Sequence, residues 1–325
     1  MKKTALIILN YNNSRDTRNC IESIQRCNTA PVKYVVVDNA SNPQERDALK
    51  SVLTDLFPEG YGIVDGANPP DSNTCLPECT LVLNDKNLGY ACGNNSGLNF
   101  TRYDDEIDKL MILNNDILFV EDIIPALSGM LSELPHCGLL SPVLYKKGMR
   151  EYDLNCARKN VRLSRMITDN FLFYYYQWRN MGILDIDPDM FILLGNPPKE
   201  GIIEVELPSG SCMLIYKSLF EKIGYFDPNT FLYLEENILY KKLSALGYKN
   251  YVSLDNKCIH LGAASTKKIS GSAWLMRKAK QSEKYYVKTY SGASLPSRIL
   301  YSLSLNFFLF TLSMQKTLKK MLTSK

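Results

Sequence analysis

Three adjacent polar residues, Asn114, Asn115 and Asp116, follow the apolar run 110–113. Carboxylate, water and phosphate oxygens are the ligands that Mg²⁺ and Mn²⁺ prefer, so this triplet suits a hard cation with a bound diphosphate. Asn and Asp are also ordinary turn residues. The triplet alone therefore leaves two interpretations open, a metal and diphosphate site or an Asx-rich turn.

Two adjacent carboxylates, Glu235 and Glu236, lie in the otherwise apolar stretch 231–246, whose spacing predicts a helix. Neighbouring residues point about 100° apart on a helix, so one carboxylate can face a site while the other faces elsewhere. Transfer of a group to a hydroxyl needs a base that takes the proton, and a partly buried carboxylate suits this role. The alternative is a solvated helix face beside Lys241 and Lys242.

A third candidate is His260, one of two histidines in the chain. It follows the strand-like run 251–254 and precedes a glycine and the polar segment 265–268. Glycine, hydroxyls and lysines together are a suitable surrounding for a phosphate. A lone histidine is more often structural, so both interpretations stay open.

The elements that must position these residues alternate between strand-like and helix-like patterns over the first 150 residues. Short apolar runs predict strands buried on both faces of a parallel sheet. Ser14 is a candidate cap for the helix after the first strand. Two further strands are expected later in the chain, the second of them leading to His260. The runs that predict strands are 5–9, 34–37, 80–83, 110–113, 212–215 and 251–254.

This alternation predicts an α/β fold with an open, Rossmann-like, mostly parallel sheet flanked by helices. Ligands of such sheets bind outside the carboxyl ends of the strands. Asn10, Asp38 and Asp116 each follow a predicted strand, so we expect them to meet there. The segment 57–79, rich in Gly, Pro, Asp and Asn, predicts a surface loop, and 145–204 is interpreted as an elaboration over the site.

Charge is divided unevenly along the chain. From Ala263 onward there are twelve Lys or Arg and one acid, Glu283, a net charge of +11, whereas the preceding residues carry −7. Such a basic tail attracts phosphates on lipid headgroups, nucleic acid or a phosphorylated substrate, or is a solvated surface. Nine cysteines without a disulfide framework fit a reducing cytoplasm.

An apolar stripe runs through 299–314 within this tail. A spanning helix needs about 20 apolar residues, so this segment is too short. Leu300, Leu303, Phe307, Phe310 and Met314 recur at spacings of three and four, and basic residues flank them. We expect a helix lying on the anionic inner face of the cell membrane; the alternative is packing on the protein or at a dimer interface.

The order of eight short motifs along the chain is more specific than any one of them. They are Leu9–Asn12, Val35–Ser41, Asn87–Gly97, Leu113–Asp116, Gly210–Cys212, Ile223–Asp227, Phe231–Glu236 and His260–Ser265. Together they closely resemble glycosyltransferase family 2, and most strongly its bacterial rhamnosyl- and galactofuranosyltransferase-like branch. The resemblance covers roughly residues 4 to 268.

This resemblance implies a GT-A fold, an inverting single displacement, and a UDP- or dTDP-sugar donor with Mg²⁺ or Mn²⁺ as cofactor. It implies that Glu236 is the catalytic base and that Glu235 beside it contacts the acceptor. Asp116 matches the last acid of the metal-binding triplet, and His260 matches the second metal or phosphate ligand. Asp38 matches a nucleobase contact, Asn10 the nucleoside pocket and Asn95 the block that closes over the donor. The full donor-binding set is Asn10, Tyr11, Asp38, Asn39, Gly89, Asn95, Asn114 and Asn115.

Three positions depart from the family pattern. The metal triplet holds one acid, Asp116, so the metal is held by fewer charges, with Asn114 and Asn115 expected at ribose and phosphate. Glu236 replaces the commoner Asp at the base, and Ile238 stands where many members have an acid.

The sequence therefore predicts two parts. Residues 1–268 form the GT-A domain, with a nucleotide-binding half (1–120) and an acceptor and catalytic half (121–268), and 269–325 form a helical basic tail. The expected partners are a nucleotide-sugar, a lipid-linked or glycan acceptor of cell-surface polysaccharide (O-antigen or capsule) synthesis, and the membrane surface. We expect no nucleic-acid partner, and a homodimer as a further form. The alternatives are an inactive sugar-nucleotide or glycan-binding module and a nucleotidyltransferase.

Overall fold

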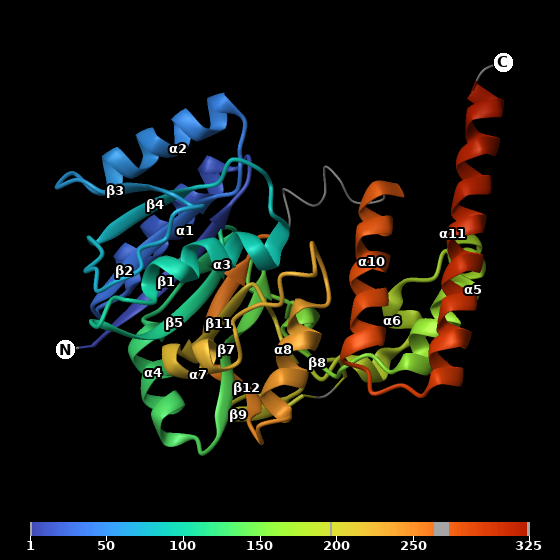
Figure 1. The fold of residues 1–325 in the computed structure, drawn as a ribbon. Helices are drawn as coiled ribbons and strands as arrows, with labels where there is room; N and C mark the ends of the chain where they lie inside the picture. Colours follow the sequence, from blue (N-terminus) through green and yellow to red (C-terminus); the bar gives the residue numbers. More distant parts are fainter. Residues whose placement is uncertain (1, 196, 263–272, 324–325) are drawn as a thin grey trace.

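The computed structural model describes residues 2–195, 197–262 and 273–323. A twisted ten-stranded sheet forms its centre (Figure 1), in the order β3-β4-β2-β1-β5-β11-β7-β12-β6, with β9 also paired to β12. The ten strands are β1 Lys3–Asn10, β2 Val32–Asp38, β3 Gly62–Asp65, β4 Cys79–Leu83, β5 Ile107–Asn114, β6 Ile117–Phe119, β7 Cys137–Lys146, β9 Ile202–Val205, β11 Cys212–Tyr216 and β12 Lys249–His260. A separate pair joins β8 Ala157–Arg158 and β10 Leu207–Pro208.

Helices cover both faces of this sheet and extend beyond it (Figure 1). They are α1 Ser14–Cys27, α2 Pro43–Leu56, α3 Gly89–Thr101, α4 Ile123–Glu133, α5 Leu163–Trp178, α6 Ile183–Ile186, α7 Lys217–Lys222, α8 Glu235–Ser244, α10 Ala273–Thr289 and α11 Leu295–Thr323. Two short 3₁₀ turns are η1 Leu154–Cys156 and η2 Pro188–Met190.

Strand pairing brings the polar strand ends together. β1 runs parallel to β2 and β5, and in this register Asn10 pairs with Asp38 while Leu9 pairs with Asn114. β11 enters antiparallel between β5 and β7. The predicted α/β fold with a mostly parallel sheet is therefore confirmed, with antiparallel strands added on one side.

The apolar strands divide their side chains between two cores because successive residues point to opposite faces. Leu6 and Ile8 of β1 pack with α1, α2 and α4 in one core. Ala5 and Ile7 pack with α3, α7 and α8 in the other. Gly97 lets α3 approach the sheet closely, since a Cβ there would lie 2.6 Å from a Val37 methyl.

Three local predictions differ from the structure: a helix start, a loop and a helix cap. The predicted helix 231–246 begins only at Glu235, because Tyr233 and Leu234 take left-handed φ angles of +70° and +71°. The predicted loop 57–79 contains strand β3, a half-exposed edge strand. Asn13, and not Ser14, caps α1, with its side chain accepting from the Asp16 N–H.

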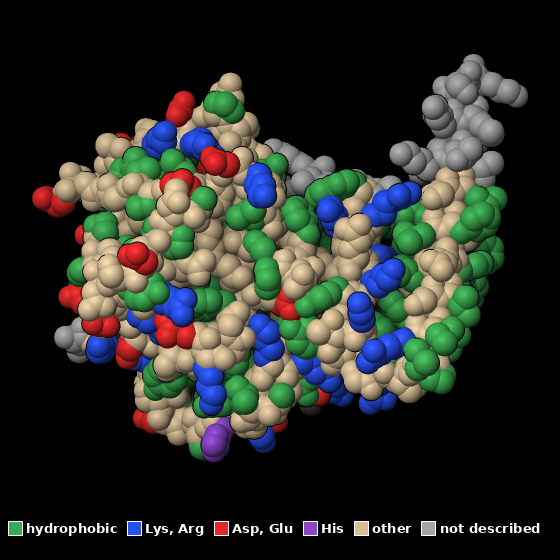
Figure 2. Space-filling model, viewed as in Figure 1, with side chains coloured by type: hydrophobic (Ala, Val, Ile, Leu, Met, Phe, Trp, Pro, Cys, Tyr) green, Lys and Arg blue, Asp and Glu red, His purple; other side chains and the backbone are tan. Residues whose placement is uncertain are grey.

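A third core joins α5, α8, α10 and α11. Ile238 of α8 lies in it with Tyr286 of α10 and Tyr301 of α11, and hydrophobic side chains line the outer edge of α11 (Figure 2). Helix α5 belongs to the stretch 145–204, which the sequence interpretation placed over the site. This helix instead packs against α11, so that interpretation is wrong for α5.

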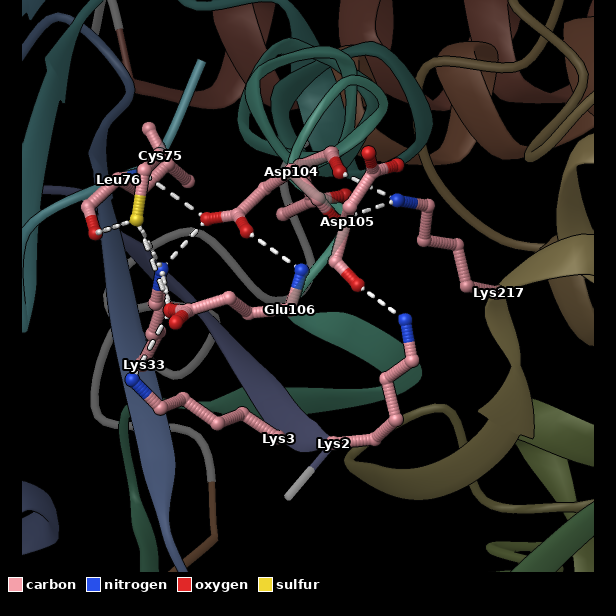
Figure 3. A network of polar contacts seen from close by, with 10 residues as sticks. Lys2, Lys3, Lys33, Cys75, Leu76, Asp104, Asp105, Glu106 and Lys217 are labelled. Carbon is pink, nitrogen blue, oxygen red and sulfur yellow. Dashed lines mark hydrogen bonds and ion pairs between the residues drawn. The ribbon is translucent and has the colours of Figure 1, made fainter. Parts of the chain in front are cut away.

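A buried charged cluster lies at the amino edge of the sheet, opposite the strand ends described above (Figure 3). The Lys33 ammonium lies 2.7 Å from a carboxylate oxygen of Asp104 and of Glu106 and 3.2 Å from the Cys75 sulfur. Cys75, Asp104 and Glu106 are close enough together to hold a metal ion. Because the Lys33 ammonium already lies among them, we interpret the cluster as a structural ion-pair network.

We expect Asp104→Asn to lower the free energy of unfolding by about 3 kcal/mol, since it leaves a buried ammonium without its main counter-charge. The side chains of Lys33 and Asp104 are 3% and 1% exposed. Urea unfolding measures this loss. The matched control is exposed Asp105→Asn, for which we expect a change within about 0.5 kcal/mol; equal losses in both variants would contradict the interpretation.

Candidate active site

A cavity of about 550 Å³ opens at the carboxyl edge of the sheet, bounded by the start of α8 and the start of α10. Most of its surface is apolar, with polar groups concentrated on the sheet side. Nine of the residues singled out in the sequence line it: Tyr11, Asn39, Gly89, Asn114, Asn115, Asp116, Glu235, Glu236 and His260. Strand register and helix placement have thus brought together residues more than 200 positions apart.

Asn10 and Asp38 lie beneath the cavity and do not line it. Both are fully buried. The Asn10 amide donates to an Asp38 oxygen at 3.2 Å, and the Arg46 Nε donates to the other Asp38 oxygen at 2.8 Å. The Asp38 carboxylate is therefore held by the ends of β1 and α2, and its contact with a nucleobase stays a prediction.

Asn39 fixes the loop that carries Gly89. Its amide nitrogen donates to the Gly89 carbonyl at 3.0 Å, and its amide oxygen accepts from the Leu88 N–H at 3.0 Å. Gly89 has a φ of +78°, and a Cβ there would lie 2.1 Å from the Phe231 carbonyl oxygen. Tyr90 N–H donates to that same oxygen at 2.8 Å, so only glycine permits this approach of α3 to the loop before α8.

Asn95 makes a second connection between these segments, away from the cavity. Its amide nitrogen donates to the Phe226 carbonyl at 2.9 Å, and its amide oxygen accepts from the Phe226 N–H at 3.2 Å. The motif residue thus joins α3 to the turn that precedes Glu235 and Glu236.

Asn114 and Asn115 use their amide nitrogens within the protein. Asn114 donates to the Ser211 hydroxyl at 3.1 Å, and Asn115 donates to the Thr17 hydroxyl at 3.0 Å and to the Asn13 carbonyl at 3.1 Å. These bonds hold the turn after β5 against α1 and β11. Asp116 is the member of the triplet that carries a carboxylate.

Asp116 and His260 meet at the cavity. The His260 Nε2 lies 3.4 Å from Asp116 Oδ1, while Nδ1 lies 2.6 Å from an oxygen of Asp153. Burial acts to lower the pKa of His260, but the two carboxylates outweigh it and raise that pKa to about 10. Sequence analysis missed Asp153, which no motif or spacing connects to His260. The polar segment 265–268 lies outside the described residues.

This donor set fits a divalent cation. A histidine that binds a metal through one ring nitrogen usually has its other nitrogen bonded to a carboxylate or carbonyl, and Asp153 holds Nδ1 in this way. Nε2 then points at Asp116, so one imidazole and one carboxylate face the same place. A cation bound there would displace the Nε2 proton, which the two carboxylates otherwise hold on the ring by raising its pKa. Phosphate and water oxygens would complete the coordination of Mg²⁺ or Mn²⁺.

The Glu236 side chain is oriented toward the cavity by its surroundings. Its Oε1 accepts from the Gly210 N–H at 3.1 Å and lies 3.8 Å from a guanidinium nitrogen of Arg158. Tyr90 donates to the Gly210 carbonyl at 2.6 Å. A Cβ at Gly210 would lie 2.8 Å from Glu236 Oε1, so the glycine permits the contact. Sequence analysis missed Arg158, which is part of the two-residue strand β8.

Glu235 has a contrasting environment in the first turn of the same helix. It is 5% exposed, and its Oε1 has no hydrogen-bond partner among the described residues. Burial, followed by the charge of Glu236, raises the pKa of Glu235 to about 8. At neutral pH the carboxyl is mostly protonated and can donate a hydrogen bond.

Aromatic side chains form the outer wall of the cavity. Phe231 and Trp274 meet edge to face with ring centroids 5.5 Å apart, and the Lys278 ammonium lies 5.2 Å from the centre of the Phe231 ring. Tyr11 and Tyr233 also line the cavity. Flat aromatic faces suit the stacking of nucleobases and the apolar faces of sugars.

Comparison with known proteins supports this architecture. No family model matches the chain. The low-salt glycan biosynthesis hexosyltransferase Agl10 of Haloferax volcanii is 24% identical over 232 residues, covering 71% of this chain and 58% of that protein. A crystal structure of GalNAc-T7 with UDP, GalNAc and Mn²⁺ superposes with a TM-score of 0.59 at 12% identity, covering 98% of this chain and 57% of that one. Residues 1–349 of S. aureus TarS give a TM-score of 0.49 at 11% identity, covering 95% of this chain and 80% of that one.

The superposition with GalNAc-T7 and the sheet order confirm the predicted GT-A fold. The chain spans less than two thirds of the length of either Agl10 or the GalNAc-T7 chain. The comparisons thus support a glycosyltransferase-like protein without identifying its donor, acceptor or branch.

We expect Glu235→Gln to gain stability relative to wild type as the pH rises. A carboxyl whose folded pKa is raised from 4.5 to about 8 stabilises the fold below pH 4.5, and this contribution is lost as the pH rises to about 8. Glutamine does not ionise, so its contribution to stability does not change over this pH range. The difference in free energy of unfolding between Glu235→Gln and wild type should widen by about 1.4 kcal/mol per pH unit inside this window.

Denaturant unfolding at several pH values between 5 and 8.5 measures this gap. The control is exposed Glu133→Gln, for which the gap should stay constant. A constant gap for Glu235→Gln would show that burial does not keep this carboxyl protonated.

Proposed function

We propose that this protein is an inverting glycosyltransferase that moves a sugar from a UDP- or dTDP-sugar to a hydroxyl group of its acceptor. The observation that carries this proposal is the single cavity lined by Asp116 and His260 on the sheet side and by Glu235 and Glu236 on the helix side. A diphosphate site and a candidate base therefore face the same volume. Agl10 is named a hexosyltransferase, and the GalNAc-T7 crystal contains UDP, which supports a sugar-nucleotide donor.

In this mechanism Glu236 takes the proton of the acceptor hydroxyl as its oxygen attacks the anomeric carbon. The new glycosidic bond forms on the face opposite the bond that breaks, and a nucleoside diphosphate leaves with the bonding electrons. Arg158 and the Gly210 N–H hold Glu236 in place. Protonated Glu235 donates a hydrogen bond to the acceptor.

On the donor side, we propose that Asp116 and His260 hold Mg²⁺ or Mn²⁺, which when bound neutralises charge on the leaving diphosphate. Tyr11, Asn39, Gly89, Asn114 and Asn115 line the remaining donor space. Asn10, Asp38 and Asn95 hold these segments from outside the cavity, so in this proposal they support donor binding through the residues that line it.

We further propose a place in cell-surface polysaccharide synthesis, with a lipid-linked or glycan acceptor and a rhamnosyl- or other hexosyl-type donor. The name of Agl10 points to glycan biosynthesis. The basic tail supports a location in the cytoplasm on the inner face of the membrane, and a homodimer is a further form to test.

We expect Glu236→Gln to lower the turnover number by about 10²- to 10⁴-fold while donor affinity changes little, because the amide cannot accept the proton. Product analysis after incubation with UDP-, dTDP- and GDP-sugars measures transfer, and calorimetry measures donor binding. Glu133→Gln is the control. Release of pyrophosphate in place of a nucleoside diphosphate would identify a nucleotidyltransferase, and a wild-type protein that binds donor without turnover would be a binding module.

We expect Asp153→Asn to weaken Mn²⁺ binding about 10- to 100-fold, since Asp153 orients the His260 ring. Electron paramagnetic resonance of Mn²⁺, with donor present at a fixed concentration, measures this without catalysis. The control is Asp104→Asn, which changes the cluster at the opposite edge of the sheet. Equal Mn²⁺ affinity of wild type and Asp153→Asn, or transfer that persists in EDTA, would contradict the metal site.

A further inference from the structure

Helices α5 and α11 present one continuous apolar surface to the outside. Eleven of the twenty large hydrophobic side chains that are exposed in the described part of the chain belong to these two helices, so the exposure is concentrated and not scattered. We call these residues the α5–α11 surface: Phe171, Leu172, Tyr175, Trp178, Leu295, Ile299, Leu300, Leu303, Phe307, Phe310 and Met314.

The two helices contribute to this surface without a break. The rings of Phe171 and Phe307 meet with centroids 5.5 Å apart, which joins the stripes of α5 and α11. Trp178 is 77% exposed and Leu295 is 72% exposed. Figure 2 shows the hydrophobic side chains of α11 along the outer edge of the molecule. A patch of this kind marks an interaction site, because its contact with water is unfavourable.

The opposite face of α11 packs against the rest of the protein. Tyr301, Leu305 and Phe308 are at most 4% exposed. The Asn170 amide of α5 donates to the Ser304 hydroxyl of α11 at 3.1 Å within this contact. Only one face of α11 is therefore available to an external partner.

This arrangement bears on whether α11 crosses a membrane. The segment Leu295–Gln315 has 21 residues and contains an 18-residue window with a mean hydropathy of 1.2. By length and composition it could span a bilayer, so the expectation that the apolar segment is too short was wrong. Its partner α5 has 16 residues, about 24 Å of helix, which is shorter than the ~30 Å apolar core. Because one face of α11 is bound to this short helix, α11 is better suited to lie on a bilayer surface than to span the bilayer.

Basic residues lie at the ends of this surface. Residues 295–315 contain no Asp or Glu and one base, Arg298. Arg179 lies at the end of α5, 6.0 Å from the centre of the Trp178 ring. Asp169, the one acid within α5, is paired with Arg165 at 2.6 Å.

The tail adds to this positive charge. Its single acid, Glu283, accepts from the Lys280 ammonium at 2.8 Å and from the Tyr301 hydroxyl at 2.9 Å. The sequence continues with Lys316, Lys319 and Lys320, whose side chains lie outside the described part. An apolar face flanked by cations is complementary to anionic headgroups above an acyl layer.

We propose that the α5–α11 surface docks flat on an anionic lipid bilayer, with the aromatic side chains of α5 inserted at the headgroup level beside the apolar stripe of α11. This extends the membrane location given under the proposed function, on which it rests, from a tail helix alone to a two-helix face. Trp178 has the apolar body and polar edge that suit the interface.

Charge favours a bilayer over a second copy of the chain. In a two-fold dimer the same patch faces itself. Arg179 and Arg298 would then be buried in an interface to which neither copy of the α5–α11 surface contributes an acid, and buried charges without a partner oppose association. Anionic lipids supply the missing negative charge.

Co-sedimentation of the full chain with vesicles tests the proposal, using phosphatidylcholine alone or mixed with phosphatidylglycerol. We expect binding to the anionic vesicles that weakens at high salt. Trp178→Glu on α5 and Phe310→Glu on α11 should each lower the partition coefficient about tenfold. The matched control is Ile63→Glu on β3, 52% exposed in the native protein, for which we expect a change below about twofold.

Trp178 also reports its own position, because the chain has two tryptophans, Trp178 and Trp274. In a Trp274→Phe background, we expect the emission of Trp178 to shift to the blue with anionic vesicles and to be quenched by lipids brominated near the headgroup. In a Trp178→Phe background the remaining emission should show no such quenching.

Two results would overturn the proposal. If Phe310→Glu weakens vesicle binding and Trp178→Glu does not, α5 is no part of the docking surface. If wild type does not bind vesicles and light scattering shows a dimer that both variants dissociate, the surface joins two copies of the chain. Vesicle binding needs no sugar transfer, so its failure and the failure of the proposed enzyme are separate observations.

Discussion

The need to satisfy buried polar groups at the strand ends determines most of this site. Asn10 and Asp38 are fully buried and Asn115 is 8% exposed, and each amide or carboxylate finds its partner in a neighbouring strand or helix. An unsatisfied group there would cost about 1–3 kcal/mol. This hydrogen-bond network fixes the ends of β1, β2 and β5 relative to one another. The residues that follow these strand ends, Asp116 among them, are therefore held in fixed positions facing the cavity.

The two carboxylates of α8 show how one helix turn supplies two chemical states. Glu236 is partly exposed and bonded to a backbone N–H, whereas Glu235 is buried with an oxygen that has no partner among the described residues. Keeping Glu235 neutral avoids two like charges in one small volume. Such an unsatisfied group weakens the fold near neutral pH, which is a typical cost at sites built for binding or proton transfer.

Sequence patterns predicted the parts of the fold that depend on local rules. Buried strands such as β1 are continuous apolar runs, and the motif around Gly89, taken in order with the other seven motifs, is specific enough to predict the GT-A fold. Asp153 and Arg158 were missed because their roles arise from contacts across 107 and 78 residues, which no local period records. The start of α8 was missed because the left-handed backbone at Tyr233 belongs to no helical pattern but is held by tertiary contacts.

The loop before α8 is bonded on both sides, and this limits where the chain can be shortened. Its Phe231 carbonyl accepts from Tyr90 of α3, while its Leu232 carbonyl accepts from the Ser282 hydroxyl of α10 at 3.0 Å. Asp227, upstream of this loop, accepts from the Tyr285 hydroxyl of α10 at 3.0 Å. A chain truncated before α10 would keep the strands of the sheet yet lose the cavity wall formed by Trp274 and Leu275 and the hydrogen bonds from α10 to the segment before α8.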